Sequence, residues 1–261
     1  MTDEICINSV LKSPKKMRFF VKLVERECHD TQERVALLRH RLKAIRYQYQ
    51  LMEQQKIHYA FYPINKAEAY LLYMIDSLED LDLLLKRDPY FPHTRADVIP
   101  VVNTEALVRE AQDYLGVEHF SQADIDQGVL DYGVQPVDQE ADYLLAIKEV
   151  PPFSPLLSEE EQNDVHYRTI LAQEGHFSQI EFSDENPVGM QVGITVVKGP
   201  LDETKALVES CPVFPDTMVE YTHLMTLKQA WKYTVEELAK LRRPLTTDEA
   251  KWPFEAVTTA N

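Results

Sequence analysis

The sequence predicts an α+β protein in which two ferredoxin-like (βαββαβ) repeats form an intramolecular dimeric α/β barrel. Three observations lead to this class. The same order of strand and helix patterns occurs twice along the 261 residues. An unusual P-x-F-P sequence stands at the same place in both copies, as Pro89-Tyr90-Phe91-Pro92 and, 123 residues later, as Pro212-Val213-Phe214-Pro215. Each expected sheet is also apolar on both faces, so the sheet of the other copy is its natural cover.

The first repeat is expected at residues 17–115. Its opening segment "MRFFVKLVE" has the alternation of a strand, and apolar residues spaced by three and four from Thr31 onward predict a long amphipathic helix. Two aromatic-rich strands follow, "IHYAFYP" and "AYLLYMID". A short helix that Ser77 caps and Pro89 ends precedes the strand "RADVIPVV" and a further helix, "NTEALVREAQDYL".

The second repeat is expected at residues 141–241 and has the same order. "DYLLAIKEV" is its first strand, and a long helix runs from Ser158 to Gly175. The strands "HFSQIEFS" and "MQVGITVV", a short helix, the strand "TMVEYTHLM" and the helix "LKQAWKYTVEELAKL" complete it. Outside the repeats we expect a flexible leader, a linker and a C-terminal tail, at residues 1–16, 116–140 and 242–261.

Composition narrows the function classes. The chain is 44% hydrophobic and carries a net charge of −16, which repels phosphate backbones and anionic lipid, so nucleic acid is not an expected partner. No apolar stretch approaches the roughly 20 residues of a membrane helix. Three cysteines, Cys6, Cys28 and Cys211, lack metal-ligand spacing, which predicts free thiols, a cytoplasmic location and no metal site. The expected partner is a small-molecule substrate, and a tail containing Trp252 suggests a homo-oligomer.

The segments "MRFFVKL" and "DPYFPHTRADVIPV", with their counterparts "LLAIKEV" and "CPVFPDTMVEYTHL", resemble the muconolactone isomerase family and the related YCII-like domains. The resemblance implies a cofactor-independent isomerase, cyclase or lyase. It also implies site residues: the family's first-strand lysine falls on Lys22 and Lys148, and its last-strand acid falls on Asp97 and Glu220. The family's Arg-His pair has no counterpart here, because the second strands have other residues at that place.

Lysine and acid are expected to face each other across neighbouring strands, Lys22 with Asp97 and Lys148 with Glu220. A buried lysine beside a carboxylate could transfer protons next to a carbonyl if burial lowers its pKa. Such a pair could equally be a cross-strand ion pair that stabilises the sheet.

Further candidate catalytic residues lie on the strands. His58 and Tyr59 begin the second strand, and histidine is the side chain best suited to acid-base chemistry near neutral pH. Glu181 and His223 are a candidate acid-base pair of the second repeat, although strand parity decides whether they face the core or solvent. Five aromatic residues are expected to contact substrate, with ordinary core packing as the alternative: Tyr62, Tyr73, Phe91, Phe214 and Tyr221.

The function expected from these residues is proton transfer on a small unsaturated lactone or carbonyl compound, in catabolism or specialised metabolism, with no cofactor. Two alternatives stay open. One is a ligand-binding or assembly protein of the same fold without turnover. The other is a haem- or oxygen-dependent enzyme of the same barrel superfamily.

Overall fold

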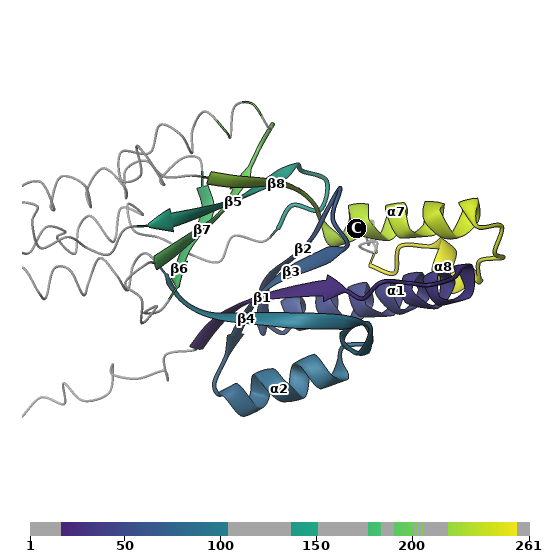
Figure 1. Ribbon diagram of the computed structural model, residues 1–261, viewed down its shortest axis with the longest axis horizontal. Helices are drawn as coiled ribbons and strands as arrows, with labels where there is room; N and C mark the ends of the chain where they lie inside the picture. Colours follow the sequence, from purple (N-terminus) through teal and green to yellow (C-terminus); the bar gives the residue numbers. More distant parts are fainter. Residues whose placement is uncertain are drawn as a thin grey trace, which may run out of the picture.

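The computed structural model describes residues 17–103, 137–150, 177–183, 191–200, 202, 205 and 219–254, and we restrict structural statements to them. Within this part, eight strands close into a barrel in the order β1-β3-β2-β8-β5-β7-β6-β4 (Figure 1). The strands are β1 (Met17–Glu25), β2 (Ile57–Pro63), β3 (Glu68–Ile75), β4 (Thr94–Asn103), β5 (Tyr143–Val150), β6 (Phe177–Ser183), β7 (Gln191–Lys198) and β8 (Val219–Met225). The helices are α1 (Thr31–Glu53), α2 (Leu78–Arg87), the 3₁₀ turn η1 (Phe91–His93), α7 (Leu227–Lys240) and α8 (Thr247–Ala250).

Strand order divides the barrel into two four-stranded sheets of the same topology. The first is β4-β1-β3-β2 and the second is β8-β5-β7-β6, and every pairing is antiparallel. The sheets join edge to edge, β2 with β8 and β4 with β6. The second strand of each half also has a register shift at its start, between Ile57 and Tyr59 and between Phe177 and Gln179. The mixed α+β class is confirmed, and an origin by duplication stays a prediction.

The expected boundaries in the first half are accurate where capping chemistry defines them. The Asp30 carboxylate accepts from the Glu33 backbone N–H at 2.8 Å and begins α1. Ser77 accepts from the Asp80 N–H at 3.1 Å and begins α2, which ends at Arg87, before Pro89. The P-x-F-P segment forms η1, and Phe91 packs against the core there.

Several expected features lie outside the described residues. They are the leader, the helix "NTEALVREAQDYL", the linker up to residue 136, the long helix from Ser158 and the second P-x-F-P segment. Among the helices that are described, none is both long and apolar enough to cross a membrane.

The described apolar side chains form two large cores, because the strands of the first half are buried on both faces, and one small cluster on the second half. One core fills the barrel interior, and the other lies between the outer face of the first sheet and its helices. The interior contains Phe20, Tyr59, Phe61, Tyr70, Leu72, Val101, Tyr143, Leu145, Ile194, Val196 and Leu224. The outer core contains, among others, Val21, Leu38, Ile45, Tyr62, Leu71, Tyr73, Leu227, Trp231 and Leu238.

Helix α7 belongs to the second half in sequence but packs on the first half. It contacts β2 and lies beside α1, and Trp231 enters the outer core (Figure 1). The tail then folds back over both helices, where Trp252 makes edge contacts with Tyr49 and Trp231. Trp252 therefore packs within its own chain, and self-association stays a prediction.

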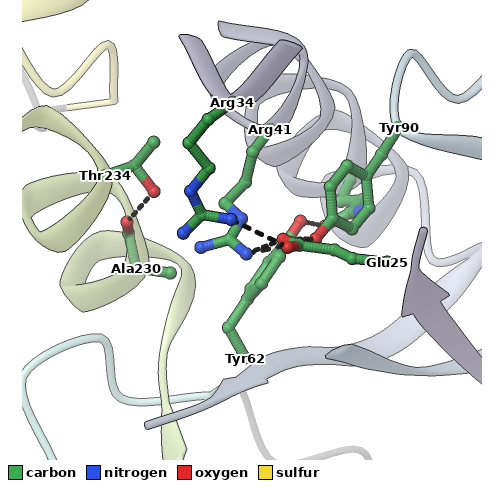
Figure 2. Close-up of polar contacts among 8 residues, drawn as sticks. Glu25, Arg34, Arg41, Tyr62, Tyr90, Ala230 and Thr234 are labelled. Atoms are coloured by element: carbon green, nitrogen blue, oxygen red, sulfur yellow. Dashed lines mark hydrogen bonds and ion pairs between the residues drawn. The ribbon is translucent and has the colours of Figure 1, made fainter. Parts of the chain in front are cut away.

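A buried polar network ties α1 to the sheet. Figure 2 shows Arg34 and Arg41, both from α1, and Tyr90 converging on the carboxylate of Glu25 at the end of β1. Arg34 donates at 3.1 Å, and Arg41 also donates to the Tyr90 hydroxyl at 3.2 Å. The Glu25 carboxylate is buried and requires such partners, because an unpaired buried charge is strongly destabilising.

Asp88 is the second buried acid of this region. One carboxylate oxygen accepts from the Tyr90 backbone N–H at 2.8 Å and the other from the Gln48 amide at 2.9 Å. Gln48 in turn accepts from the Tyr62 hydroxyl at 3.0 Å. Burial raises the pKa of Asp88 to about 6, although both of its hydrogen bonds act in the opposite direction.

Removing the Trp231 side chain tests whether α7 completes the first half. Trp231 is 2% exposed, so Trp231→Ala should lower the free energy of unfolding by about 3–5 kcal/mol, the range for large core truncations. Chemical denaturation followed by circular dichroism measures the change. Leu83→Ala on α2, a residue 45% exposed, is the control and should cost less than about 1 kcal/mol. Equal effects of the two variants would contradict this packing.

The Asp88 carboxyl should make stability depend on pH. Its pKa is higher in the folded protein than its ordinary value of 3.8, so the unfolded chain binds fewer protons between these values, and stability falls as pH rises from about 4 to 6. The wild type should lose about 2 kcal/mol between pH 4.5 and pH 7.5 relative to Asp88→Asn, out of about 3 kcal/mol for the full shift. Urea unfolding at pH 4.5 and pH 7.5 measures it. A difference between the two proteins that does not change with pH would refute the assignment.

Candidate functional site

Charged side chains meet at one end of the barrel interior. Lys22 on β1 has the same strand parity as Phe20, which lines the interior, and its Nζ lies 3.0 Å from Oε1 of Glu68. The Tyr70 hydroxyl donates to the other oxygen of Glu68. Lys22 and Glu68 are both partly exposed. They therefore lie where the interior meets solvent, near the turn that joins β2 to β3.

The second half of the chain contributes to the same site through β8. Lys66, in the β2–β3 turn, forms an ion pair with Glu220 and donates to the Thr222 hydroxyl at 3.3 Å. The site thus spans the junction at which β2 pairs with β8. We call these six residues the mouth cluster: Lys22, Lys66, Glu68, Tyr70, Glu220 and Thr222.

Electrostatics fix the protonation of two members of the mouth cluster. Burial raises the pKa of Tyr70 well above its usual range, and the hydrogen bond to Glu68 and the negative charge of Glu68 raise it further. Tyr70 therefore remains a hydrogen-bond donor at any physiological pH. The hydrogen bond from Lys66, followed by the positive charge of Lys66, lowers the pKa of Glu220, and Lys22 adds to this shift. Glu220 therefore remains a carboxylate.

This arrangement has the groups that enolisation requires. Removal of a proton beside a carbonyl needs a base at the carbon and a hydrogen-bond donor at the oxygen, where negative charge develops. The Glu68 carboxyl group has unused lone pairs, since the Lys22 ammonium contacts one of its oxygens, the Tyr70 hydroxyl donates to the other, and each oxygen can accept two hydrogen bonds. The Lys22 ammonium and the Tyr70 hydroxyl are donors directly beside it.

The predicted partnership of Lys22 and Asp97 is correct for the backbone and wrong for the side chains. Their Cα atoms are cross-strand partners on β1 and β4. Lys22 nevertheless pairs with Glu68 from the opposite neighbour, β3, and Asp97 pairs with Arg95 on its own strand at 3.2 Å. The central strand has a neighbour on each side, and Arg95 is the nearer cation for Asp97.

Lys148 and Glu220 are not cross-strand partners. In the register of β5 with β8, Lys148 lies opposite Val219, while Ile147 lies opposite Glu220. The prediction was off by one residue, which in a strand exchanges the two faces. The side chain of Lys148 is outside the described part of the chain, and that of Glu220 pairs with Lys66 from the first half.

His58 and Tyr59 lie away from the mouth cluster. His58 occupies the bulge of β2 and is buried, with its ring 5.7 Å from that of Tyr59 in the barrel interior. Burial, followed by the nearby charge of Arg18, lowers the pKa of His58 to about 4, so the ring is neutral at pH 7. Arg18 precedes Lys22 by four residues on β1, which corresponds to about 13 Å along a strand.

The candidates of the second half are dispersed. Two strands, β5 and β7, separate Glu181 on β6 from His223 on β8. His223 alternates with Thr222 and Leu224 and so belongs to the outer face, and the side chain of Glu181 is outside the described part. Tyr221 is also on the outer face, where the Lys205 ammonium lies 4.9 Å from its ring centroid. Phe214 lies outside the described residues.

Three of the aromatic residues expected at the substrate lie in the outer core instead. Tyr62 and Tyr73 are buried beneath α1, on the face of the sheet opposite to Lys22, and Phe91 packs beside them at η1. Tyr62 donates to Gln48 and is part of the buried network. Strand parity separates them from the mouth cluster.

Sequence reasoning missed Glu68, Tyr70, Lys66 and Thr222 as site residues. A signal for two of them was present, because Glu68 and Tyr70 alternate on the strand that follows the second one. In the register with β1, Tyr70 lies opposite Lys22 and Glu68 opposite Val24. No signal pointed to Lys66 and Thr222, since their contact depends on the pairing of β2 with β8. In that pairing Tyr62 lies opposite Met225, which follows it by 163 residues in the sequence.

Comparison with known proteins supports the fold. No family model matches the chain, and no curated protein matches it in sequence. Solved structures of chlorite dismutase variants from Candidatus Nitrospira defluvii are similar. One has a TM-score of 0.52 at 12% identity and covers 86% of this chain and 97% of that chain. A second has a TM-score of 0.51 at 10% identity, covering 83% and 94%.

A third chlorite dismutase variant from the same organism, in complex with cyanide, has a TM-score of 0.50 at 10% identity and covers 83% of this chain and 94% of that chain. These values show a shared fold over most of both chains. The similar structures reported above are chlorite dismutases and not muconolactone isomerases, so the resemblance to the latter family stays a prediction. What the chain shares with its structural neighbours is a ferredoxin-like α+β fold.

Proposed function

We propose that the protein is an enzyme that transfers a proton beside the carbonyl group of a small lactone or carbonyl compound, at the mouth cluster and without a cofactor. One observation carries the proposal: the Glu68 carboxylate lies between the ammonium of Lys22 and the hydroxyl of Tyr70 at the end of a closed barrel. A base and two donors at a partly exposed position form a compact site for enolisation.

The proposed steps conserve protons and electrons. Glu68 takes a proton from the carbon next to the carbonyl, and the electron pair of the broken C–H bond forms a carbon–carbon double bond. The carbonyl oxygen becomes an enolate oxygen, which the Lys22 ammonium and the Tyr70 hydroxyl stabilise by hydrogen bonds. Glu68 then returns the proton to a different carbon of the conjugated system. The net result is isomerisation, and return to the original carbon gives hydrogen exchange with solvent.

Hydrogen exchange tests the proposal with a neutral unsaturated lactone. In D₂O the wild type should incorporate deuterium into α-angelica lactone, as nuclear magnetic resonance can follow. Glu68→Gln removes the base and should slow the exchange by about 10²–10⁴-fold, the usual contribution of general base catalysis. Lys22→Met should also slow it, because one of the donors to the oxyanion is lost.

Lys86→Met is the matched control for removing an ammonium. Lys86 forms an exposed ion pair with Asp82 on α2, away from the barrel interior. Exchange at the wild-type rate in Glu68→Gln would overturn the proposal. Binding of the lactone with no exchange in the wild type would instead favour a ligand-binding protein without turnover.

A second candidate function is a haem-dependent enzyme of the same fold, and two observations favour it. One structurally similar chlorite dismutase variant was solved with cyanide, which is a ligand of transition metals. In this chain, Nδ1 of His58 is buried and has no hydrogen-bond partner among the described side chains. A neutral imidazole with an unpaired nitrogen fits a haem iron, whose role would be to bind and activate small oxidising ligands.

Haem titration distinguishes this second candidate. If His58 holds the iron, the wild type should shift the haem absorption band at stoichiometric haem, and His58→Ala should lose the shift. His29→Ala, at an exposed histidine before α1, is the control and should bind haem as the wild type does. Equal spectra for His58→Ala and the wild type would exclude His58 as the ligand.

A further inference from the structure

We infer that Lys66 is the anchoring residue for a carboxylate group of the substrate, and that Glu220 occupies this position as an internal competitor. The inference rests on the proposed function and names its substrate class. The mouth cluster would select carbonyl compounds that also carry a carboxylate, such as small oxo acids.

The two partners of Lys66 differ in how firmly they are held. Thr222 is 8% exposed and is fixed in β8, and its hydroxyl accepts from the Lys66 ammonium at 3.3 Å. The side chain of Glu220 is 63% exposed, although it forms an ion pair with the same ammonium. Thr222 therefore defines where the ammonium lies, while Glu220 can leave it for solvent.

Exchange of one carboxylate for another costs little at this position. Exposed ion pairs contribute little to stability, because water replaces either partner readily. The charges of the mouth cluster balance, since Lys22 and Lys66 face Glu68 and Glu220. A substrate carboxylate that displaces Glu220 from Lys66 preserves this balance locally, whereas a neutral substrate gains nothing from Lys66.

Lys22 relates the anchoring position to the proposed chemistry. Its positive charge acts on the carboxylate of Glu220 as well as on that of Glu68. The position of the Glu220 carboxylate is therefore within electrostatic reach of the ammonium that would stabilise the enolate. A small molecule whose carboxylate binds Lys66 would thus extend toward Lys22 and Glu68 with its remaining atoms.

Two substitutions with opposite expected effects test the inference. The probes are 4-oxopentanoate, which has a ketone and a carboxylate, and its neutral methyl ester, with dissociation constants measured by ligand-observed magnetic resonance. Lys66→Met should weaken binding of the acid by about tenfold, a typical value for one lost charge-assisted hydrogen bond. Glu220→Gln should tighten it by about threefold because the competing charge is gone. Binding of the ester should change by less than twofold in both variants.

Matched controls come from the exposed pair on α2. Lys86→Met and Asp82→Asn change the same charges far from the barrel interior and should leave the affinity for the acid unchanged. The inference is overturned if Lys66→Met binds the acid as the wild type does, if Glu220→Gln weakens binding, or if the wild type does not prefer the acid to the ester. Glu68→Gln separates the two proposals. If that variant loses lactone exchange while the wild type does not prefer the acid to the ester, the proposed function stands and only the inference is removed.

Discussion

Closure of the barrel is the constraint on which the rest of the structure depends. Each half alone is an open sheet with two edge strands, and open edges expose unpaired backbone groups to other chains. The junctions β2–β8 and β4–β6 pair both sets of edges within one molecule. They also create an enclosed interior in which aromatic side chains from both halves meet, as the rings of Phe61 and Tyr143 do. The mouth cluster exists only because β8 is brought beside the β2–β3 turn.

Strand parity then separates two kinds of polar chemistry. On the outer face, Glu25 and Asp88 are buried beneath α1 with satisfied hydrogen bonds, which suits a structural network. On the inner face, Lys22 and Glu68 remain partly exposed at the end of the barrel, where a small molecule can reach them. The bulge at His58 reverses parity within β2, so that Ile57 faces the outer core and Tyr59 the interior.

The sequence predicted local features well and long-range pairing poorly. Apolar spacing located α1, and the Ser77 cap with Pro89 located α2, because these signals lie within a few residues of each other. Lys22 was identified through the family resemblance of its strand, and its actual partner Glu68 was missed because β3 and β4 both flank β1. The contact of Lys66 with Glu220 joins residues 154 positions apart and follows from barrel closure, which no local pattern encodes. The aromatic residues Tyr62 and Tyr73 were misplaced by a single step of alternation.

The position of α7 has a consequence for synthesis of the chain. Trp231 and Leu227, together with Met225, Ala230 and Leu238, complete a core whose remaining buried members lie in the first hundred residues, and they are made more than 100 residues later. The ribosome makes this helix more than 100 residues after the first sheet, so the growing chain presents an incompletely covered apolar side of that sheet in the meantime. Complete folding of the first half therefore waits for α7, and we expect chaperones that shield apolar surface to bind the chain during that delay.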